Sequence, residues 1–303
     1  MTAVKKLIAF VLVLAVLSFA GCSERAAIQE LLSEHAGGQQ ELVEPVPQLL
    51  AVELPPVVEE PVYEPEEDLT PEPEQSEYNA PPVDGGRRSR LNIDMRGAKM
   101  VALTFDDGPI AVHTDRILDL LEEHGGRATF FVQGYRVASH SEIIQRTVRL
   151  GSEVAGHSWN HQDYSLIEDE AVIEADIRST SEAIRAVGGN PPAIYRPPFG
   201  RTNNAAEQAS ARLGYAIINW TLDTRDWEHR DPDIVYDSIM RTVESGDIIV
   251  MHDVHGSTAE AMERVIPALI EQGFELVTVT ELLTHAFGEL EPGVVYGRNY
   301  NRN

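Results

Sequence analysis

From Lys99 onward, short apolar runs alternate regularly with longer segments of helical periodicity. The runs predict strands, in chain order, at 100–105, 128–132, 153–155, 193–195, 216–221, 247–251 and 275–279. The segments between them predict helices at 114–124, 142–150, 205–213, 232–243 and 259–272, and a longer helix that opens at a capping box from Ser165 to Glu168. Strands that alternate with helices pair in parallel through crossover connections. The sequence therefore predicts an α/β fold, built as an open doubly wound sheet or as a barrel.

Composition narrows the classes of partner that the chain can bind. Its 303 residues are 43% hydrophobic, which is enough for a packed core and excludes disorder along the whole length. The net charge of −25 repels phosphate, so a nucleic-acid partner is not expected. Cys22 is the single cysteine, which excludes a disulfide framework and a thiolate metal cluster. Any metal site must therefore use nitrogen and oxygen ligands.

The N-terminus has the pattern of an export signal. A lysine pair precedes an apolar stretch that has the length of a secretory signal and is short for a membrane-spanning helix. The run Phe19-Ala20-Gly21-Cys22 resembles the lipobox of bacterial lipoproteins, with Phe19 where leucine is usual. The sequence thus predicts a signal peptide over 1–21 and a lipid on Cys22, which would anchor the chain at the extracytoplasmic face of the cell membrane. Ordinary signal cleavage, which gives a secreted protein, and an uncleaved anchor are the alternatives.

Acidic residues and prolines dominate the segment that follows the signal. Between Ser23 and Gly86 there are 16 acidic residues against one basic residue, and 10 of the 18 prolines. Such a segment repels itself and lacks the periodicity needed for packing, so 22–98 is predicted to be a lipid-anchored, disordered linker. A folded domain is expected over 99–287. The remainder, 288–303, shows no period and is predicted to be a disordered tail.

Chemically active side chains come directly after several of the predicted strands. Parallel strands place their carboxyl ends at one edge of the sheet, and barrels carry their chemistry at that edge. These side chains should therefore lie near one another. In chain order they are Asp106 and Asp107, His157 and His161, Arg196, Asp223, Asp226 and Trp227, and His252 and Asp253.

The spacing of His157 and His161 indicates a metal site if the chain turns between them. In an extended strand these residues would lie roughly 13 Å apart, whereas a helical or turn-like path brings them within roughly 6 Å. Two imidazoles and one aspartate would leave a position open for water, as catalytic zinc sites do. Taken alone, the pair fits equally one ordered structural histidine and one solvated histidine. The Asp-Asp-Gly-Pro run from Asp106, taken alone, fits a simple turn.

Five short motifs, taken together, resemble those of one enzyme family. They are Thr104 to Pro109, His157 to His161, Arg196 to Gly200, Asp223 to Trp227 and Val250 to His252. In this order they look like the motifs of the polysaccharide deacetylases, the NodB-homology group of carbohydrate esterases, and the resemblance spans about Lys99 to Leu283. It implies a distorted seven-stranded β/α barrel as the catalytic domain, a divalent metal that is often zinc, and hydrolysis of N-acetyl groups on sugars.

The resemblance assigns roles to residues of the first three motifs. Asp107, His157 and His161 match the metal ligands of the family. Asp106 matches the general base, and Arg196 matches the residue that orients this base.

The third, fourth and fifth motifs also match groups that act on the sugar and on its leaving amine. His252 matches the general acid, and Asp226 matches the carboxylate that tunes it. Phe199 and Trp227 match walls of the sugar groove, and the backbone N–H of Phe199 matches an oxyanion donor. Phe199 stands where relatives often have tyrosine, which removes a hydroxyl and no backbone donor. The role of His255, close to His252, stays open.

Export, a tether and this resemblance together point to a cell-wall substrate. The expected function is metal-dependent removal of N-acetyl groups from N-acetylglucosamine residues of peptidoglycan, with release of acetate, by a monomer. Chitin oligomers, poly-N-acetylglucosamine and acetylxylan are alternative substrates. A catalytically silent glycan-binding lipoprotein is the alternative from another class. Loss of a metal ligand or of the base would favour that alternative, and the sequence retains all of these residues.

Overall fold

The computed structural model describes residues 97–297. The predicted signal peptide (1–21), the lipid site Cys22 and the linker up to residue 96 lie outside the described residues, as does the chain from 298 onward. Within 97–297, no helix combines the length and the apolar character needed to cross a membrane.

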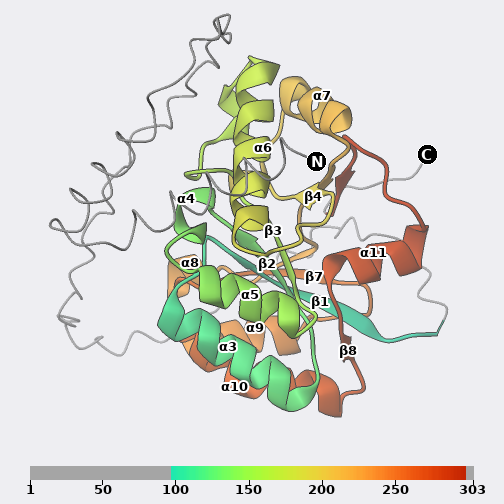
Figure 1. The fold of residues 1–303 in the computed structure, drawn as a ribbon. Coiled ribbons are helices and arrows are strands. Elements are labelled where there is room, and N and C mark those ends of the chain that lie inside the picture. The colour runs from blue at the N-terminus through green and yellow to red at the C-terminus, as the bar shows by residue number, and fades with distance from the viewer. Residues whose placement is uncertain (1–96, 298–303) are drawn as a thin grey trace, which may run out of the picture. The chain divides into compact units, whose positions relative to one another are not determined.

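The strands form one sheet in which every pair is parallel. The order across it is β6-β7-β1-β2-β3-β4-β5-β9, with β8 paired to β1. Figure 1 shows helices packed around this curled sheet, and the predicted distorted β/α barrel is confirmed. The strands are β1 (Met100–Asp106), β2 (Thr129–Val132), β3 (Glu153–Gly156), β4 (Ile194–Tyr195), β5 (Ala216–Ile218), β6 (Leu222–Asp223), β7 (Ile248–His252), β8 (Glu275–Leu276) and β9 (Val295–Tyr296).

Helices fill the connections between strands. Helices α3, α9 and α10 pack along one side of the sheet, and α6 lies against α7 on another (Figure 1). Short 3-10 turns cover Tyr164–Leu166 and Pro198–Gly200. The helices are α3 (Ala111–His124), α4 (Gly134–Val137), α5 (Ser141–Arg149), α6 (Glu170–Ala186), α7 (Asn204–Leu213), α8 (Asp226–His229), α9 (Pro232–Met240), α10 (Gly256–Glu271) and α11 (Val279–Phe287).

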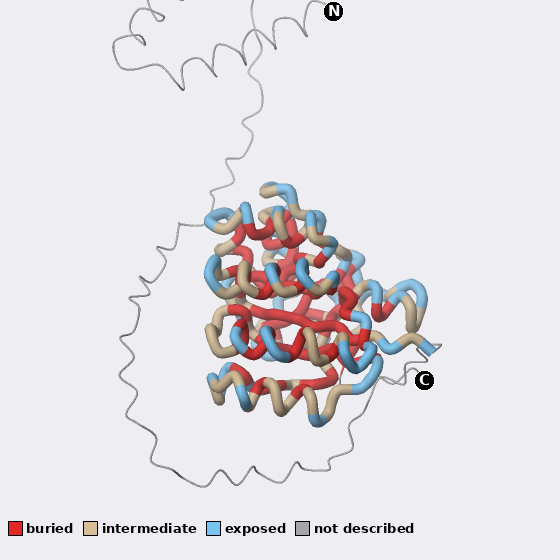
Figure 2. The backbone as a smooth tube through the Cα atoms, turned by 90° about the horizontal axis from the view of Figure 1, so that it is seen from below, coloured by how far each residue is buried: buried red, intermediate tan, exposed pale blue. Residues whose placement is uncertain are grey.

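Strand β1 shows how the period of the sheet positions the candidate site. Leu103 and Phe105 pack in the apolar cluster that includes α3 and α10, whereas Ala102 belongs to the cluster formed largely by the other strands. Successive side chains of a strand point to opposite faces, so Thr104 and Asp106 share the face of Ala102. Figure 2 shows that the strands at the centre of the domain are almost entirely buried. A carboxylate at the end of β1 is therefore placed in a dry environment.

The fifth predicted strand is divided into β5 and β6. The reason is a change of hydrogen-bond partner along the chain: Asn219 N–H donates to Tyr296 O of β9 at 2.7 Å, and Thr221 N–H donates to Ile248 O of β7 at 2.9 Å. The segment 219–221 thus passes from β9, at one edge of the sheet, to β7, the second strand from the other edge.

Helix α6 begins later than the capping box predicts. Asp163 accepts the N–H of Ser165 and closes the 3-10 turn, while Asp169 accepts the N–H of Ala171 and caps α6. Aspartate is at least as good an N-cap as serine, so two aspartates that flank Ser165 determine where the chain turns and where the helix starts. The prediction of a helix opened by Ser165 is wrong.

The chain after Gly288 also differs from the predicted disordered tail, as far as residue 297. Val295–Tyr296 forms β9 and pairs with β5. Tyr296 is 1% exposed, and its ring lies 5.8 Å from that of Phe287. A strand of this length leaves no periodic signal in the sequence, and burial of the tyrosine orders it.

Candidate metal centre and active site

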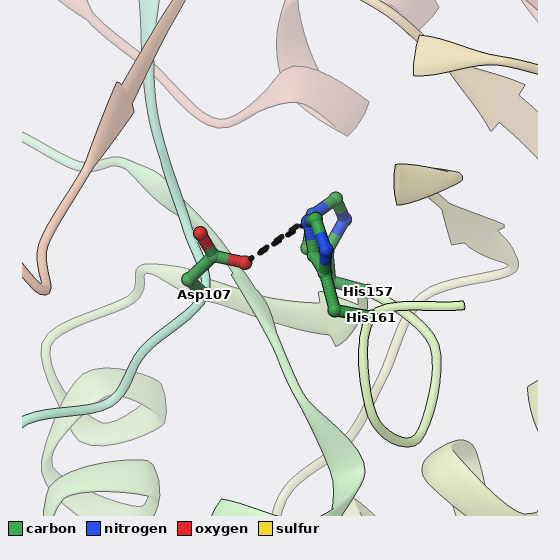
Figure 3. A group of neighbouring side chains, drawn as sticks. All are labelled: Asp107, His157 and His161. Carbon is green, nitrogen blue, oxygen red and sulfur yellow. Dashed lines mark ion pairs between the residues drawn. The ribbon is translucent and has the colours of Figure 1, made fainter. Parts of the chain in front are cut away.

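Asp107, His157 and His161 come together at the carboxyl edge of the sheet. Asp107 follows β1, and both histidines follow β3. Asp107 Oδ1 lies 3.6 Å from His157 Nε2 and 3.5 Å from His161 Nε2. Figure 3 shows the carboxylate facing both imidazole rings, and one ligand atom from each residue lies within 4.8 Å of the others. The three residues predicted as ligands therefore form one cluster.

The backbone turns sharply between the two histidines. Ser158 and His161 have φ of 60° and 64°, in the left-handed region that non-glycine residues seldom adopt. Gly134 N–H donates to Ser158 O at 3.0 Å, which ties the turn to the start of α4. The same conformation recurs at this edge of the sheet in Asp107 (φ 75°) and Phe199 (φ 60°). The path is not extended, as a shared metal requires.

Partners of the ligands fix their orientation. His157 Nδ1 lies 2.9 Å from Arg196 O, and because a carbonyl only accepts, this nitrogen carries a proton, while Nε2 is the ring nitrogen that faces Asp107. Gln133 Nε2 donates to Asp107 Oδ1 at 2.7 Å. Two imidazole nitrogens and one carboxylate oxygen suit a divalent ion of the zinc type, with a position left for water or substrate.

The charge states of two ligands suit metal binding. Burial raises the pKa of Asp107, but the imidazoles of His157 and His161 act in the opposite direction and the net pKa is lowered. Burial is also the main influence on His161, where it lowers the pKa and favours the neutral imidazole that can ligate. The aspartate is thus ionised and His161 is neutral near pH 7.

Asp106 and Arg196 form a buried ion pair beside the cluster. Arg196 Nη1 lies 2.6 Å from Asp106 Oδ1 and donates to Thr104 Oγ1 at 2.8 Å, while Nε donates to Ile218 O at 3.2 Å. The other oxygen of Asp106, Oδ2, lies 4.0 Å from His157 Nε2. Asp106 thus uses one oxygen for the guanidinium and turns the other toward the metal ligands.

His252 reaches the site from the neighbouring strand, where it is the register partner of Asp106. Its Nδ1 lies 2.8 Å from Asp226 Oδ1, and Thr258 Oγ1 donates to Asp226 Oδ2 at 2.6 Å. Burial lowers the pKa of His252, but Asp226, Asp106 and Asp107 raise it more, to about 9. His252 is therefore protonated at neutral pH, and its Nδ1–H donates to the carboxylate.

Two aromatic side chains lie exposed at the same edge. Phe199 is 53% exposed and Trp227 is 50% exposed, which is unusual for side chains of this size. The Phe199 ring meets the His161 ring edge-on at 4.6 Å, and Trp227 follows Asp226 in α8. The His255 ring lies 6.1 Å from that of His252. Exposed rings beside a polar centre are available to a ligand.

Comparison with known proteins identifies the family of this arrangement. Residues 94–218 match the family model described as polysaccharide deacetylase. The chain is 33% identical over 192 residues to the peptidoglycan-N-acetylglucosamine deacetylase of Bacillus cereus, which covers 62% of this chain and 89% of that protein. The chain belongs to the polysaccharide deacetylase family.

Other polysaccharide deacetylases are similar over the same region. The chain is 36% identical over 184 residues to the peptidoglycan-N-acetylglucosamine deacetylase PgdA of Listeria monocytogenes, and this match spans 61% of the chain but only 39% of PgdA. The solved structure of the T48 deacetylase with substrate superposes with a TM-score of 0.62 at 34% identity, over 67% of this chain and 99% of that one.

The structure also reveals supporting residues at this edge of the sheet that the five motifs do not contain. Gln133 follows β2, so the strand-end pattern that identified the other site residues would have found it. Asp253 is 1% exposed, accepts from Thr114 Oγ1 at 2.5 Å, and packs where a Cβ on Gly108 would overlap its carboxylate. Burial raises the pKa of Asp253 to about 7. Its contact with Gly108 joins the ends of β1 and β7, and no spacing in the sequence indicates it.

Proposed function

We propose that the chain hydrolyses the N-acetyl groups of N-acetylglucosamine residues in peptidoglycan and releases acetate, with zinc as its metal. The observation that carries this proposal is the meeting, at one sheet edge, of a metal-ligand cluster with two groups suited to opposite proton transfers. Asp106, in its ion pair with Arg196, is suited to accept a proton, and protonated His252 is suited to donate one. The substrates named for the relatives from Bacillus cereus and Listeria monocytogenes support peptidoglycan.

Asp107, His157 and His161 would hold the metal. When bound, the ion supplies positive charge that polarises the acetyl carbonyl and lowers the pKa of water. Every other step falls to side chains and backbone groups of the chain itself.

Asp106 acts as the general base. Its Oδ2, on the side of the ligands, takes a proton from the attacking water, while Arg196 on Oδ1 holds the carboxylate in place. A positioned base of this kind contributes about 10²–10⁴ in rate. The Arg196 side chain is 0% exposed, so competing solvent does not loosen the pair.

The carbonyl oxygen gains negative charge as water adds. We assign the backbone N–H of Phe199 as a donor to this oxygen, because the ring of this residue packs against His161 and so places residue 199 beside the proposed metal ligands. Such donors act where charge develops and are each worth about 3–4 kcal/mol in known enzymes. The rings of Phe199 and Trp227 form the walls that receive the sugar.

His252 acts as the general acid. When the C–N bond breaks, the amine leaves only if it gains a proton, and His252 supplies this proton from Nε2 while Nδ1 stays on Asp226. With a pKa of about 9, the imidazole is charged over the neutral range. The products are acetate and a glycan with a free amine.

The proposal includes a place of action. The lysine pair and apolar stretch before Cys22 support export, and the lipobox-like run supports a lipid anchor on Cys22. The proline-rich acidic segment after it supports a spacer that lets an anchored domain reach an immobile polymer. Labelling with radioactive palmitate, compared between the unmodified chain and Cys22→Ala, tests the anchor; equal labelling would contradict it.

A substrate panel tests the activity. The purified, zinc-loaded chain is incubated separately with peptidoglycan, chitin oligomers and acetylxylan, and released acetate is measured. Mass spectrometry then locates the new amine. The expected result is acetate from peptidoglycan with the free amine on glucosamine. Acetate from chitin oligomers alone would replace the substrate, and glycan binding without acetate from any amide would establish the silent binder instead.

A further inference from the structure

The short segment between β5 and β6 contacts both sides of the proposed active site. Its first residue, Asn219, is half-buried. It lies outside the five motifs and is not one of the proposed catalytic residues. The Asn219 main-chain oxygen accepts from Arg196 Nη2 at 3.4 Å, and the Asn219 side-chain Nδ2 donates to Gly200 O at 3.0 Å. One residue therefore touches the arginine that holds Asp106 and the turn that carries Phe199.

The turn at Gly200 needs such support because its backbone is unusual. Phe199 and Gly200 both have positive φ, of 60° and 63°. A phenylalanine in this region is strained and persists only where the surroundings fix it. Besides the hydrogen bond from Asn219, the indole of Trp220 lies so close to Gly200 that a Cβ there would come within 2.8 Å of it.

The chemistry of the side chain at 219 is itself informative. Gly200 O only accepts, so the amide nitrogen of Asn219 must face it. Asn219 Oδ1 is then left buried, with no hydrogen-bond partner in the part of the chain that the structure describes. An unpaired buried oxygen is unfavourable for folding. The amide thus stabilises the fold less than a fully paired group would. We therefore take its hydrogen bond to Gly200 O, which holds the Phe199 turn, as its main contribution.

Strand β9 fixes Asn219 from behind. Asn219 N–H donates to Tyr296 O at 2.7 Å, and a Cβ on Gly297 would lie 2.8 Å from the carbonyl carbon of Asn219. The backbone of Asn219 is thus held in contact with β9 and with the residue that follows it.

We propose that Asn219 is a positioning residue, which sets the Phe199 turn through its side chain and supports Arg196 through its carbonyl. This assignment rests on the proposed function, because the Phe199 N–H matters only where an oxyanion forms. Asn219 touches no reacting atom. It acts through the Phe199 turn, which supplies the N–H donor, and through Arg196, which holds the base Asp106.

Asn219→Ala tests the assignment, with Asn203→Ala as the matched control. Asn203 is also half-buried, and its amide donates to Ile167 O at 2.9 Å, outside the proposed catalytic groups. On the amide substrate that the unmodified chain cleaves fastest, Asn219→Ala is expected to lower kcat about 10–100-fold, less than outright loss of an oxyanion donor. KM, zinc affinity and the circular dichroism spectrum should stay as in the unmodified chain. Asn203→Ala should lower the melting temperature and leave kcat unchanged.

Two results would overturn the assignment. One is an unchanged kcat in folded Asn219→Ala. The other is a loss of kcat that is matched by loss of zinc affinity, which would show general distortion of the site. If Asn219→Ala does not fold, Asn219→Asp takes its place, because it keeps the size of the side chain but puts an acceptor opposite Gly200 O. The same two results apply to it, and failure of both variants to fold would show a purely structural role.

A separate measurement distinguishes failure of this assignment from failure of the proposed function. If the unmodified chain releases no acetate from any substrate, the proposed function fails. The backbone amide resonance of Phe199 in a ¹⁵N-labelled sample then still reports on positioning. A large shift of this resonance in Asn219→Ala, absent in Asn203→Ala, would support the contact, and an unchanged resonance would refute it.

Discussion

Arg196, which directly follows β4, forms a 2.6 Å ion pair with Asp106 at the end of β1, although β2 and β3 lie between these two strands in the sheet. Neither side chain is more than 3% exposed. Removal of water makes the pair sensitive to any change of charge, because a buried guanidinium without a partner is costly. The pair also orients the oxygen of Asp106 that faces the metal ligands. Structure and the proposed chemistry thus depend on the same contact.

Asp106→Asn should abolish most activity while zinc binding persists. Asparagine keeps the size of the side chain but cannot accept a proton from water, so kcat should fall by about 10²–10⁴. Acetate release gives the rate, and titration calorimetry gives zinc affinity. Asp237→Asn, at an exposed ion pair with Arg241, is the matched control and should change neither. Full activity in zinc-loaded Asp106→Asn would refute the role of base.

Asp226→Asn should move the basic limb of the pH–rate profile to lower pH. The limb of the unmodified chain should lie near pH 9, where His252 loses its proton. Asp226 raises the pKa of His252 against the effect of burial, so removal of its carboxylate charge lowers that pKa. The measurement is kcat/KM from pH 6 to 10. On the basic limb, kcat/KM should fall about tenfold per pH unit. A limb that stays near pH 9 would contradict the role of His252 as the acid.

Gln133→Ala should weaken zinc binding by about 10–100-fold, the cost of losing a hydrogen bond to a metal ligand in other sites. Gln133 donates to Asp107 Oδ1, and without it the carboxylate is free to rotate. Gln145→Ala is the matched control, since Gln145 is exposed and donates to Val187 O away from the site. Zinc affinity by calorimetry decides, and equal affinities for the two variants would show that the contact is irrelevant to the metal.

Asp253→Asn should stabilise the metal-free fold at pH 8 more than at pH 4. The folded chain holds a proton on Asp253 up to about pH 7, whereas the unfolded chain loses it near 3.8, the ordinary pKa of an aspartate. The folded state therefore binds more protons in this window, and stability falls as pH rises through it. Asparagine removes this loss and keeps an oxygen to accept from Thr114. Urea unfolding at both pH values measures the difference, and a pH-independent difference would contradict the buried, protonated carboxyl.

The gathering of the chemically active residues at one edge of the sheet was predictable, because these residues stand at the carboxyl ends of the predicted parallel strands. His157, Arg196 and His252 each follow or end a strand that the apolar runs indicate, and parallel pairing brings those ends together. The turn between His157 and His161 followed from the reach of a shared metal, and the φ values of the loop agree with it.

Contacts between distant segments were not predictable. The start of α6 depends on which of several capping residues is used: Asp169 caps the helix, while the N–H of Ser165 is bound by Asp163 in a separate 3-10 turn. Strand β9 exists because Tyr296 finds a buried place beside β5, which no local pattern encodes. The partnership of Gly108 with Asp253 is of the same kind.

The left-handed backbone at Asp107, His161 and Phe199 has a practical consequence for anyone who seeks a hardier form of this domain. Non-glycine residues in this region each cost of order 1–3 kcal/mol, which glycine would largely recover. A search that ranks variants by heat resistance alone would therefore favour glycine at these positions and discard two of the proposed metal ligands and a proposed wall of the sugar groove. Selection for thermal stability therefore has to be combined with a measurement of acetate release, because otherwise it will yield stable but inactive proteins.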